Sequence, residues 1–191
     1  MIDKIVLKNI DEHIRTIDSL RGSFADSIEQ VGGMLSRSLA DGGTVFWCGN
    51  GGSAADSQHL AAELVGRFKK DRSPLRSVAL TTDSSVLTCV ANDYCYEDIF
   101  ARQIEALGRK GDVLVGFSTS GNSENILRAL KMAKRLELVT VAFLGKGGGA
   151  CANFADQALI VPSQDTARIQ EAHILIGHIV CEMVETELGL V

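Results

Sequence analysis

Five short runs of β-prone, apolar residues, separated by helical patterns, constrain the fold of this chain more than any other feature of its sequence. The runs lie at 44–48, 77–80, 112–117, 139–143 and 158–161. They are apolar throughout rather than alternating, which is typical of strands buried on both faces of a sheet. Helical patterns occupy 53–69, 84–91 with 96–107, 122–136 and 166–188. This alternation predicts an α/β fold with a five-stranded, parallel, doubly wound sheet of the flavodoxin type, covered by helices on both faces.

The segment before the first strand has a purely helical period. Apolar residues recur every third or fourth position from Ile5 to Leu20, and a second stripe begins near Ser23 or Asp26 and stops at the glycine pair 42–43. We therefore expect an N-terminal helical hairpin over 1–42, followed by an α/β core over 43–191. A chain of 191 residues without a visible linker or repeat predicts a single domain.

Composition excludes several classes of protein. With 46% hydrophobic and 23% charged residues the chain is not disordered, and its net charge of −5 gives no electrostatic case for nucleic acid. The most basic stretch, 67–72, is interpreted as a solvated helix end. No apolar run approaches the roughly 20 residues of a membrane span. Five cysteines without C-x-x-C spacing argue against a disulfide framework and favour a reduced, cytoplasmic protein.

A glycine-rich loop, Gly49-Asn50-Gly51-Gly52-Ser53, follows the first strand and opens a helix. Glycine lets the backbone approach a ligand, and a helix N-terminus offers N–H groups to an anion. The loop also fits a dinucleotide-binding pattern loosely. A glycine-rich turn has many uses, however, so this motif alone leaves open a tight turn without a ligand.

A second loop, 118–123 (Ser-Thr-Ser-Gly-Asn-Ser), follows the third strand and again opens a helix. Its hydroxyls and helix N–H groups predict a site for a phosphate monoester. The loop has no lysine of the G-K-[ST] kind, which excludes a nucleoside triphosphate loop. A helix cap rich in serine remains the alternative, because Ser, Thr and Asn all cap helices well.

Two pairs of polar residues could carry the chemistry. His59 and Glu63 are four residues apart and share one face of a helix, a spacing that suits a divalent metal or an acid/base pair but also an ordinary surface ion pair. Gln170 and His178 lie in an otherwise apolar helix, where polar groups require partners. His173, beside them, is interpreted as a core or interface histidine.

Four motifs in this order resemble the sugar isomerase (SIS) domain family: C-G-N-G-G-S-A, A-N-D, S-T-S-G-N-S and A-R-I-Q-E-x-H. The resemblance spans essentially the whole chain. It implies a cytoplasmic homotetramer with sites at subunit interfaces and one zinc ion per subunit. The implied reaction is the aldose–ketose isomerisation of sedoheptulose 7-phosphate to D-glycero-D-manno-heptose 7-phosphate, the first step toward the ADP-heptose of bacterial lipopolysaccharide.

The same resemblance assigns roles to individual residues. It implies that Glu63 and His178 are the acid/base residues. The implied zinc ligands are His59, Glu63, Gln170 and His178. The implied substrate-binding residues are Asn50, Gly51, Gly52, Glu63, Asn92, Asp93, Ser118, Thr119, Ser120, Ser123 and Gln170.

Isomerisation through an enediol requires one group to move a proton between two carbons, and a carboxylate such as Glu63 can make both transfers. His178 or zinc could open the ring and stabilise charge on oxygen. A carboxylate bound firmly to zinc is a weaker base. The zinc ion could therefore occupy its site only in part, or it could shift when substrate binds.

Helix geometry adds an expectation about assembly. Gln170 and His178 are eight residues apart, about 12 Å along a helix, whereas ligand atoms around one zinc ion lie only a few ångströms apart. We therefore expect that the two residues serve one site from different subunits.

Three rival functions remain to be weighed. Non-catalytic adaptors of the same family, which bind the bacterial replication initiator, lack the glutamate and the second histidine, whereas this chain has Glu63 and His178. A nicotinamide-dependent enzyme would need an acidic residue about 20 residues after the glycine loop, and the candidate, Asp83, lies 34 residues after Gly49. A sugar-phosphate sensor with an intact phosphate loop is the third.

Overall fold

The computed structural model describes residues 2–191, apart from the side chains of residues 3 and 23. All five strands are parallel and lie in the order β2-β1-β3-β4-β5. The strands are β1 (Val45–Cys48), β2 (Ser77–Ala79), β3 (Val113–Ser118), β4 (Val139–Leu144) and β5 (Gln157–Ile160). The helices are α1 (Ile2–Asp18), α2 (Ser23–Ala40), α3 (Gly52–Val65), α4 (Ser84–Asp93), α5 (Ala101–Leu107), α6 (Glu124–Arg135) and α7 (Thr166–Glu187), with 3₁₀ turns η1 (Tyr96–Asp98) and η2 (Ala150–Phe154). The predicted α/β class and doubly wound, flavodoxin-like sheet are confirmed.

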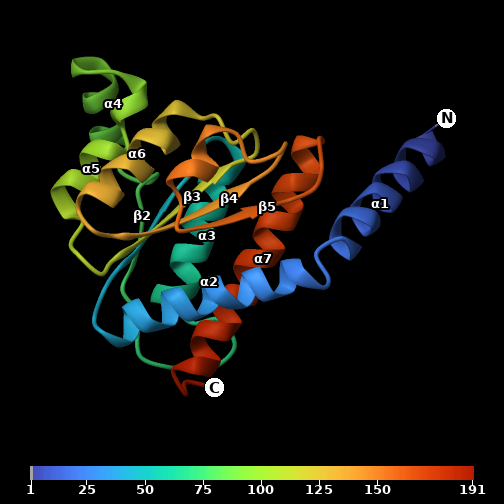
Figure 1. Cartoon of the computed structure of the whole chain (residues 1–191), viewed down its shortest axis with the longest axis horizontal. Helices are drawn as coiled ribbons and strands as arrows, with labels where there is room; N and C mark the ends of the chain where they lie inside the picture. Colours follow the sequence, from blue (N-terminus) through green and yellow to red (C-terminus); the bar gives the residue numbers. More distant parts are fainter. Residues whose placement is uncertain (1) are drawn as a thin grey trace.

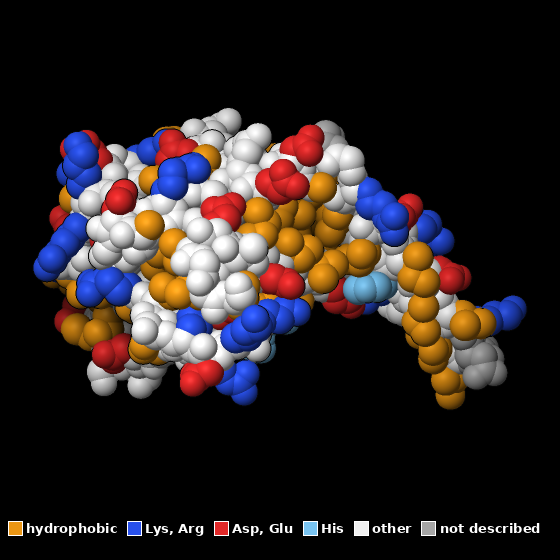
Figure 2. All heavy atoms as spheres, turned by 90° about the horizontal axis from the view of Figure 1, so that it is seen from below, with side chains coloured by type: hydrophobic (Ala, Val, Ile, Leu, Met, Phe, Trp, Pro, Cys, Tyr) orange, Lys and Arg blue, Asp and Glu red, His pale blue; other side chains and the backbone are white. Residues whose placement is uncertain are grey.

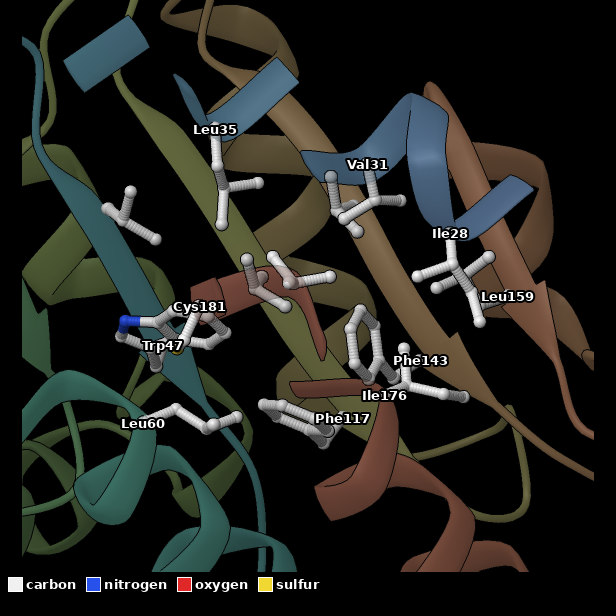
Figure 3. Packing of buried hydrophobic residues seen from close by; sticks show 14 of the residues in the cluster. Ile28, Val31, Leu35, Trp47, Leu60, Phe117, Phe143, Leu159, Ile176 and Cys181 are labelled. Carbon is white, nitrogen blue, oxygen red and sulfur yellow. The ribbon is translucent and has the colours of Figure 1, made fainter. Parts of the chain in front are cut away.

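Helices cover both faces of the sheet (Figure 1). Because side chains alternate along a strand, Trp47 of β1 points into the core formed with α2, α3 and α7, while Cys48 points toward α5 and α6. The first of these cores contains Leu60 of α3 and Ile176 of α7 on either side of Phe117 (Figure 3). Helices α3 and α7 are therefore neighbours on one face, which decides where the polar residues of both helices meet.

The strand order reverses at β1, which creates a crevice at the carboxyl ends of β1 and β3. The chain passes from β1 to β2 on one side and then returns to β3 on the other side of β1. In open α/β sheets, ligands bind at such a switch point. Both loops that the sequence singled out, after Cys48 and after Ser118, begin there, and Cys48 is paired with Gly116.

The two N-terminal helices are present, but they are arranged differently from a compact hairpin. α1 leaves the body of the molecule at an open angle to α2, and its main packing contact is with α7 (Figure 1). Polar side chains make this contact, because Arg168 donates to both the carbonyl and the side chain of Asn9, and His13 lies 2.7 Å from Glu171. The apolar face of α1 consequently faces away from this chain.

Several predicted boundaries need correction. The helix predicted over 53–69 ends at Val65, so the basic stretch 67–72 is a loop rather than a helix end. Arg67, Lys69 and Lys70 are exposed as expected, whereas the Arg72 side chain is only 2% exposed. The pattern over 96–107 is divided between η1 and α5. Burial on both faces holds for all of β3 but not for the edge strand β2, where Val78 is 39% exposed.

Within residues 2–191, no helix combines the length and the apolar character that crossing a bilayer requires.

Candidate active site

The two loops of the crevice are tied together by a reciprocal pair of amides. Asn50 donates to Asn125 over 2.9 Å, and Asn125 donates back to Asn50 over 2.7 Å. Asn125 is buried at the start of α6, and the hydroxyl of Tyr96 also donates to Asn50. The amide of Asn50, which the resemblance assigns to the sugar, is thus engaged with protein partners and fixes the two loops relative to each other.

The hydroxyls of the 118–123 loop converge at the end of β3. Ser118 Oγ lies 2.9 Å from Ser123 Oγ and 3.4 Å from Ser120 Oγ, and Thr119 lies between them on the turn. Ser123 precedes α6, and its backbone N–H donates to Ser118. Such a group of hydroxyls at a helix N-terminus suits a phosphate monoester.

The glycine loop serves packing more than anion binding. Beyond Gly52, the N–H groups of Ser53 and Ala54 already donate to loop carbonyls, so they are not available to an anion. Gly51 has φ +56°, which favours glycine. A Cβ at Gly52 would lie 2.4 Å from Nε2 of Gln170, so the absence of a side chain there makes room for Gln170.

His59, Glu63 and His178 form one cluster between α3 and α7. His59 Nε2 lies 2.9 Å from His178 Nε2 and 3.2 Å from Glu63 Oε1, and all three ligand atoms lie within 4.8 Å of one another. Ligand atoms about 2 Å from a tetrahedral zinc ion lie about 3.3 Å apart. The donor set therefore fits a divalent cation of the zinc type, with a fourth position left for another ligand.

One aromatic ring supports this cluster. Phe68 stacks on the imidazole of His178, with ring centroids 5.5 Å apart and planes at 15°. The backbone N–H of Phe68 donates to Glu185 of α7, which forms a buried ion pair with Arg72. Arg72 also donates to the carbonyl of Glu63. Burial by itself raises the pKa of Glu185, but the N–H groups of Lys69 and Phe68 and the Arg72 guanidinium outweigh it and hold that pKa below its ordinary value.

Asp56 is a site residue that the sequence reasoning missed. It is buried on α3, and its carboxylate accepts a hydrogen bond from Gln170 Nε2 over 3.2 Å. Burial raises the pKa of Asp56, whereas the hydrogen bond from Gln170 and the charges of His59 and His178 oppose this rise. Asp56, His59 and Glu63 follow the spacing i, i+3, i+7 of one helix face, which is the pattern that could have revealed it.

Gln170 is therefore bound, within a single chain, to α3, the helix that also carries His59 and Glu63. The geometry does not require Gln170 and His178 to come from different subunits, and that division stays a prediction. Asn92 and Asp93, at the end of α4, are exposed, and their described hydrogen bonds join them to each other and to Cys89. None of these described hydrogen bonds joins the two residues to the cluster or to the serine loop.

His173 is confirmed as a core histidine. It is fully buried between Phe117 and Phe143, and its Nε2 lies 3.1 Å from the carbonyl oxygen of Leu144. Nε2 must carry the proton to donate to that oxygen. The other nitrogen, Nδ1, is the one buried side-chain atom without a partner among the residues that the structure describes. Burial lowers the pKa of His173 to about 4, so it is neutral near pH 7.

Comparisons with known proteins identify the family of this chain. A model of the SIS domain matches residues 9–145. Phosphoheptose isomerase of Clostridium acetobutylicum is 55% identical over 167 residues, which cover 87% of this chain and 85% of that protein. Phosphoheptose isomerase of Helicobacter pylori is 49% identical over 185 residues, which cover 97% of this chain and 96% of that protein.

The solved structure of phosphoheptose isomerase from Neisseria gonorrhoeae superposes with a TM-score of 0.93 at 41% identity, covering 97% of this chain and 100% of that chain. The family model matches well over half of the chain, and the relatives extend the match to nearly its whole length. This protein therefore belongs to the SIS domain family.

Proposed function

We propose that this chain is an aldose–ketose isomerase that converts sedoheptulose 7-phosphate to D-glycero-D-manno-heptose 7-phosphate through an enediol. The observation that carries the proposal is the His59–Glu63–His178 cluster between α3 and α7, in a chain about half identical to phosphoheptose isomerases. The Asn50–Asn125 pair ties the glycine loop at the start of α3 to the serine loop, and from Gly52 to His59 the rise along α3 is about 10 Å. An extended seven-carbon sugar phosphate can span a separation of this order, with its phosphate at the serine loop and its carbonyl end near the cluster.

Glu63 is the base of this mechanism. Its carboxylate takes a proton from the carbon beside the carbonyl and returns it to the neighbouring carbon. A carboxylate has two oxygens, so one can face a bound cation while the other carries the proton. This division resolves the conflict between metal binding and basicity for Glu63.

His178 moves the proton on oxygen. Its Nε2 points into the cluster, and the ring is held from one side by Phe68. While Nε2 is not coordinated to a cation, it can donate a proton to the ring oxygen or the carbonyl oxygen of the sugar as Glu63 acts at carbon. With zinc on Nε2, the cation would stabilise the charge on that oxygen in its place. The hydroxyls of Ser118, Thr119, Ser120 and Ser123 hold the phosphate and keep the substrate in register.

We propose one zinc ion per subunit, held by His59, Glu63 and His178 with Gln170 completing the set. Zinc there would polarise the carbonyl oxygen and stabilise the charge that develops on it. The residues proposed to contact the sugar are Gly51, Gly52, Asn92 and Asp93. Asn50 lies at the same place and is paired with Asn125.

We also propose that the protein is a single cytoplasmic domain that assembles as a homotetramer with its sites at subunit interfaces. The support comes from α1, whose apolar side chains form a row on the projecting helix (Figure 2). Five apolar residues of α1 are between 49% and 61% exposed: Ile5, Val6, Leu7, Ile10 and Ile14. Beside α1 lies an apolar groove of about 620 Å³ that is lined by residues of α1, α2 and α7. Exposed apolar surface of this kind is typical of an interface between subunits.

Two observations weigh against the rival functions. Glu63 and His178 are both present and lie in one cluster, whereas the non-catalytic adaptors lack this glutamate and this histidine. Asp83, the acid that a nicotinamide-binding enzyme would need, is the N-cap of α4 and accepts from the N–H of Val86. A sensor would share the phosphate loop, and turnover separates it from the enzyme.

The test is to incubate the purified protein with sedoheptulose 7-phosphate, with and without added zinc, and to follow the sugar by NMR. The expected result is the appearance of the heptose 7-phosphate, which would enter the synthesis of bacterial heptose-containing glycans. Binding of the sugar phosphate without conversion under every metal condition would favour the sensor and contradict the proposal.

A further inference from the structure

The side chain of Gln170 lies against the beginning of α3, more than 110 residues before it in the sequence. Its Nε2 donates to Asp56 Oδ2 over 3.2 Å. One turn earlier on the same helix, Gly52 leaves no room for any side chain, because a Cβ there would lie 2.4 Å from Nε2 and 2.7 Å from Oε1. Position 170 is thus restricted by both neighbours.

The chemistry of the two partners decides which end of the amide points where. A side-chain amide has a donating NH₂ group and an accepting oxygen, whereas a carboxylate only accepts. Asp56 therefore selects the NH₂ group, and Oε1 of Gln170 is turned away from it. An amide at position 56 would accept either end, because it can both donate and accept.

The burial of the Asp56 carboxylate is also unfavourable for the free energy of folding. It is only 8% exposed, and its described hydrogen bond comes from a neutral amide rather than from a cation. Burying a carboxylate that no Lys or Arg pairs with is unfavourable, and only the nearby imidazoles of His59 and His178 offset this charge, so the residue calls for an explanation beyond packing.

We propose that Asp56 is a positioning residue that fixes the amide of Gln170, so that Oε1 is offered to an electron-poor group in the crevice. That group is either the cation held by His59, Glu63 and His178 or a hydroxyl of the sugar. The inference rests on the proposed function, in which Gln170 binds both zinc and substrate. It gives Gly52 a role as well, which is to leave space for the oriented side chain.

The variant Asp56→Asn tests this, because it keeps the size of the side chain and removes its selectivity. Metal-free protein is titrated with zinc, and KM and kcat are measured separately. Loss of a partner that orients a metal ligand typically weakens metal binding about 10–100-fold. Weaker zinc binding without sugar identifies the cation as the group that Oε1 meets, and a higher KM at unchanged zinc affinity identifies the hydroxyl. If neither quantity changes, the proposal is overturned.

A second variant exchanges the carboxylate and the amide between positions 56 and 170, and should thereby restore a single orientation of the amide. When Asp56→Asn is combined with Gln170→Glu, the new amide donates to the new carboxylate, and an oxygen again faces the crevice. The double variant should recover at least part of the affinity that Asp56→Asn loses. A double variant that binds zinc and sugar no better than Asp56→Asn would contradict the proposal.

Asp112 provides the matched control. It is as buried as Asp56, at 6% exposure, and it accepts from the N–H groups of Thr44 and Arg109 at the opposite end of the sheet. Asp112→Asn should lower the thermal midpoint without changing zinc affinity or KM. A change in zinc affinity or KM equal to that of Asp56→Asn would show that the effect is not specific to the orientation of Gln170.

Nitrogen-15 NMR separates this inference from the proposed function. In metal-free and sugar-free protein, the Nε2 protons of Gln170 should exchange slowly with water, and Asp56→Asn should shift their resonances and accelerate the exchange. Unchanged resonances and exchange would overturn the inference, even in an active isomerase. The expected NMR change in a protein without isomerase activity would contradict the proposed function alone.

Discussion

His173 and His178 lie five residues apart on the same helix, yet their surroundings give them different chemistry. His173 is fully buried between two phenylalanine rings, and its pKa is lowered to about 4 by that burial. His178 is half-buried and faces the histidine–glutamate cluster, where its Nε2 meets that of His59. Only the second of these residues can exchange protons with a substrate, because the first has no access to solvent or to the crevice.

The suppressed pKa of His173 predicts a dependence of stability on pH. Between about pH 6.5 and pH 4 the unfolded chain binds a proton at this residue and the folded chain does not, so the free energy of unfolding falls as the pH falls. The loss across this window is on the order of 3 kcal/mol. Urea unfolding at fixed protein concentration, followed by the fluorescence of the buried Trp47, measures it.

His173→Gln is the control for this residue, since it keeps an N–H donor for the carbonyl of Leu144 and does not titrate. The variant should lose stability less steeply than the wild type over the same pH range. Equal slopes for the two proteins would contradict the assignment of this pH dependence to His173.

The role of Glu63 predicts a specific defect in proton exchange. Glu63→Gln keeps the shape of the side chain but cannot accept the proton, so incorporation of deuterium from solvent at C1 or C2 of the sugar should fall by a factor of at least about 10². Binding of the sugar phosphate should persist, because the serine loop is untouched. Wild-type rates of deuterium incorporation in this variant would assign the base to another residue.

At the scale of elements, the loop after α3 is held in place by one buried ion pair. Arg72 and Glu185 have side chains 2% and 0% exposed, and their partners include the carbonyls of Glu63 and Leu64 and the N–H groups of Phe68 and Lys69. This pair therefore ties the end of α3, the loop and α7 together. Because Phe68 stacks on His178 and Glu63 lies in the last turn of α3, the pair supports the cluster.

Removing one member of this pair should be costly. Glu185→Gln leaves the Arg72 guanidinium buried without its counter-charge, which typically costs about 3–5 kcal/mol of unfolding free energy. Hydrogen exchange at the N–H groups of Phe68 and Lys69 should also accelerate. The same substitution at Glu137, whose ion pair with Lys110 is exposed, provides the comparison and should leave stability unchanged. Equal effects of the two substitutions would contradict the argument from burial.

At the scale of the whole molecule, the position of α1 indicates assembly. The helix projects from the body with its polar residues against α7 and its apolar residues outward (Figures 1 and 2). Isolated in water, such a face would be left uncovered, and the groove beside it is apolar as well. In the proposed tetramer, contact with further copies of the chain would cover both surfaces.

Charges on this face should prevent assembly. The double variant Ile10→Asp with Ile14→Asp is expected to convert the proposed tetramer into smaller species in sedimentation-velocity experiments, with a loss of isomerase activity if the sites lie at subunit interfaces. Leu107→Asp, an exposed apolar position on α5 away from α1, should leave the molecular mass unchanged. A double variant that sediments like the wild type would contradict this interpretation of α1.

The sequence by itself determined the features that local periodicity encodes. Apolar runs and helical spacing predict the five strands and the main helices, and the loops after β1 and β3 follow from where those strands end. The pairing of His59 with Glu63 is likewise local, because four residues make about one turn. The motifs that resemble the SIS domain family needed no structure to be recognised.

Only the tertiary structure decided which distant residues meet. Asp56 with Gln170, Asn50 with Asn125, and Arg72 with Glu185 are each separated by 75 residues or more. Their contacts depend on the packing of α3 and α7 on one face of the sheet and on the adjacency of β1 and β3, neither of which a local pattern records. The tertiary structure also decided the direction of α1. An amphipathic stripe shows that a helix has an apolar face, but it does not show which surface covers that face.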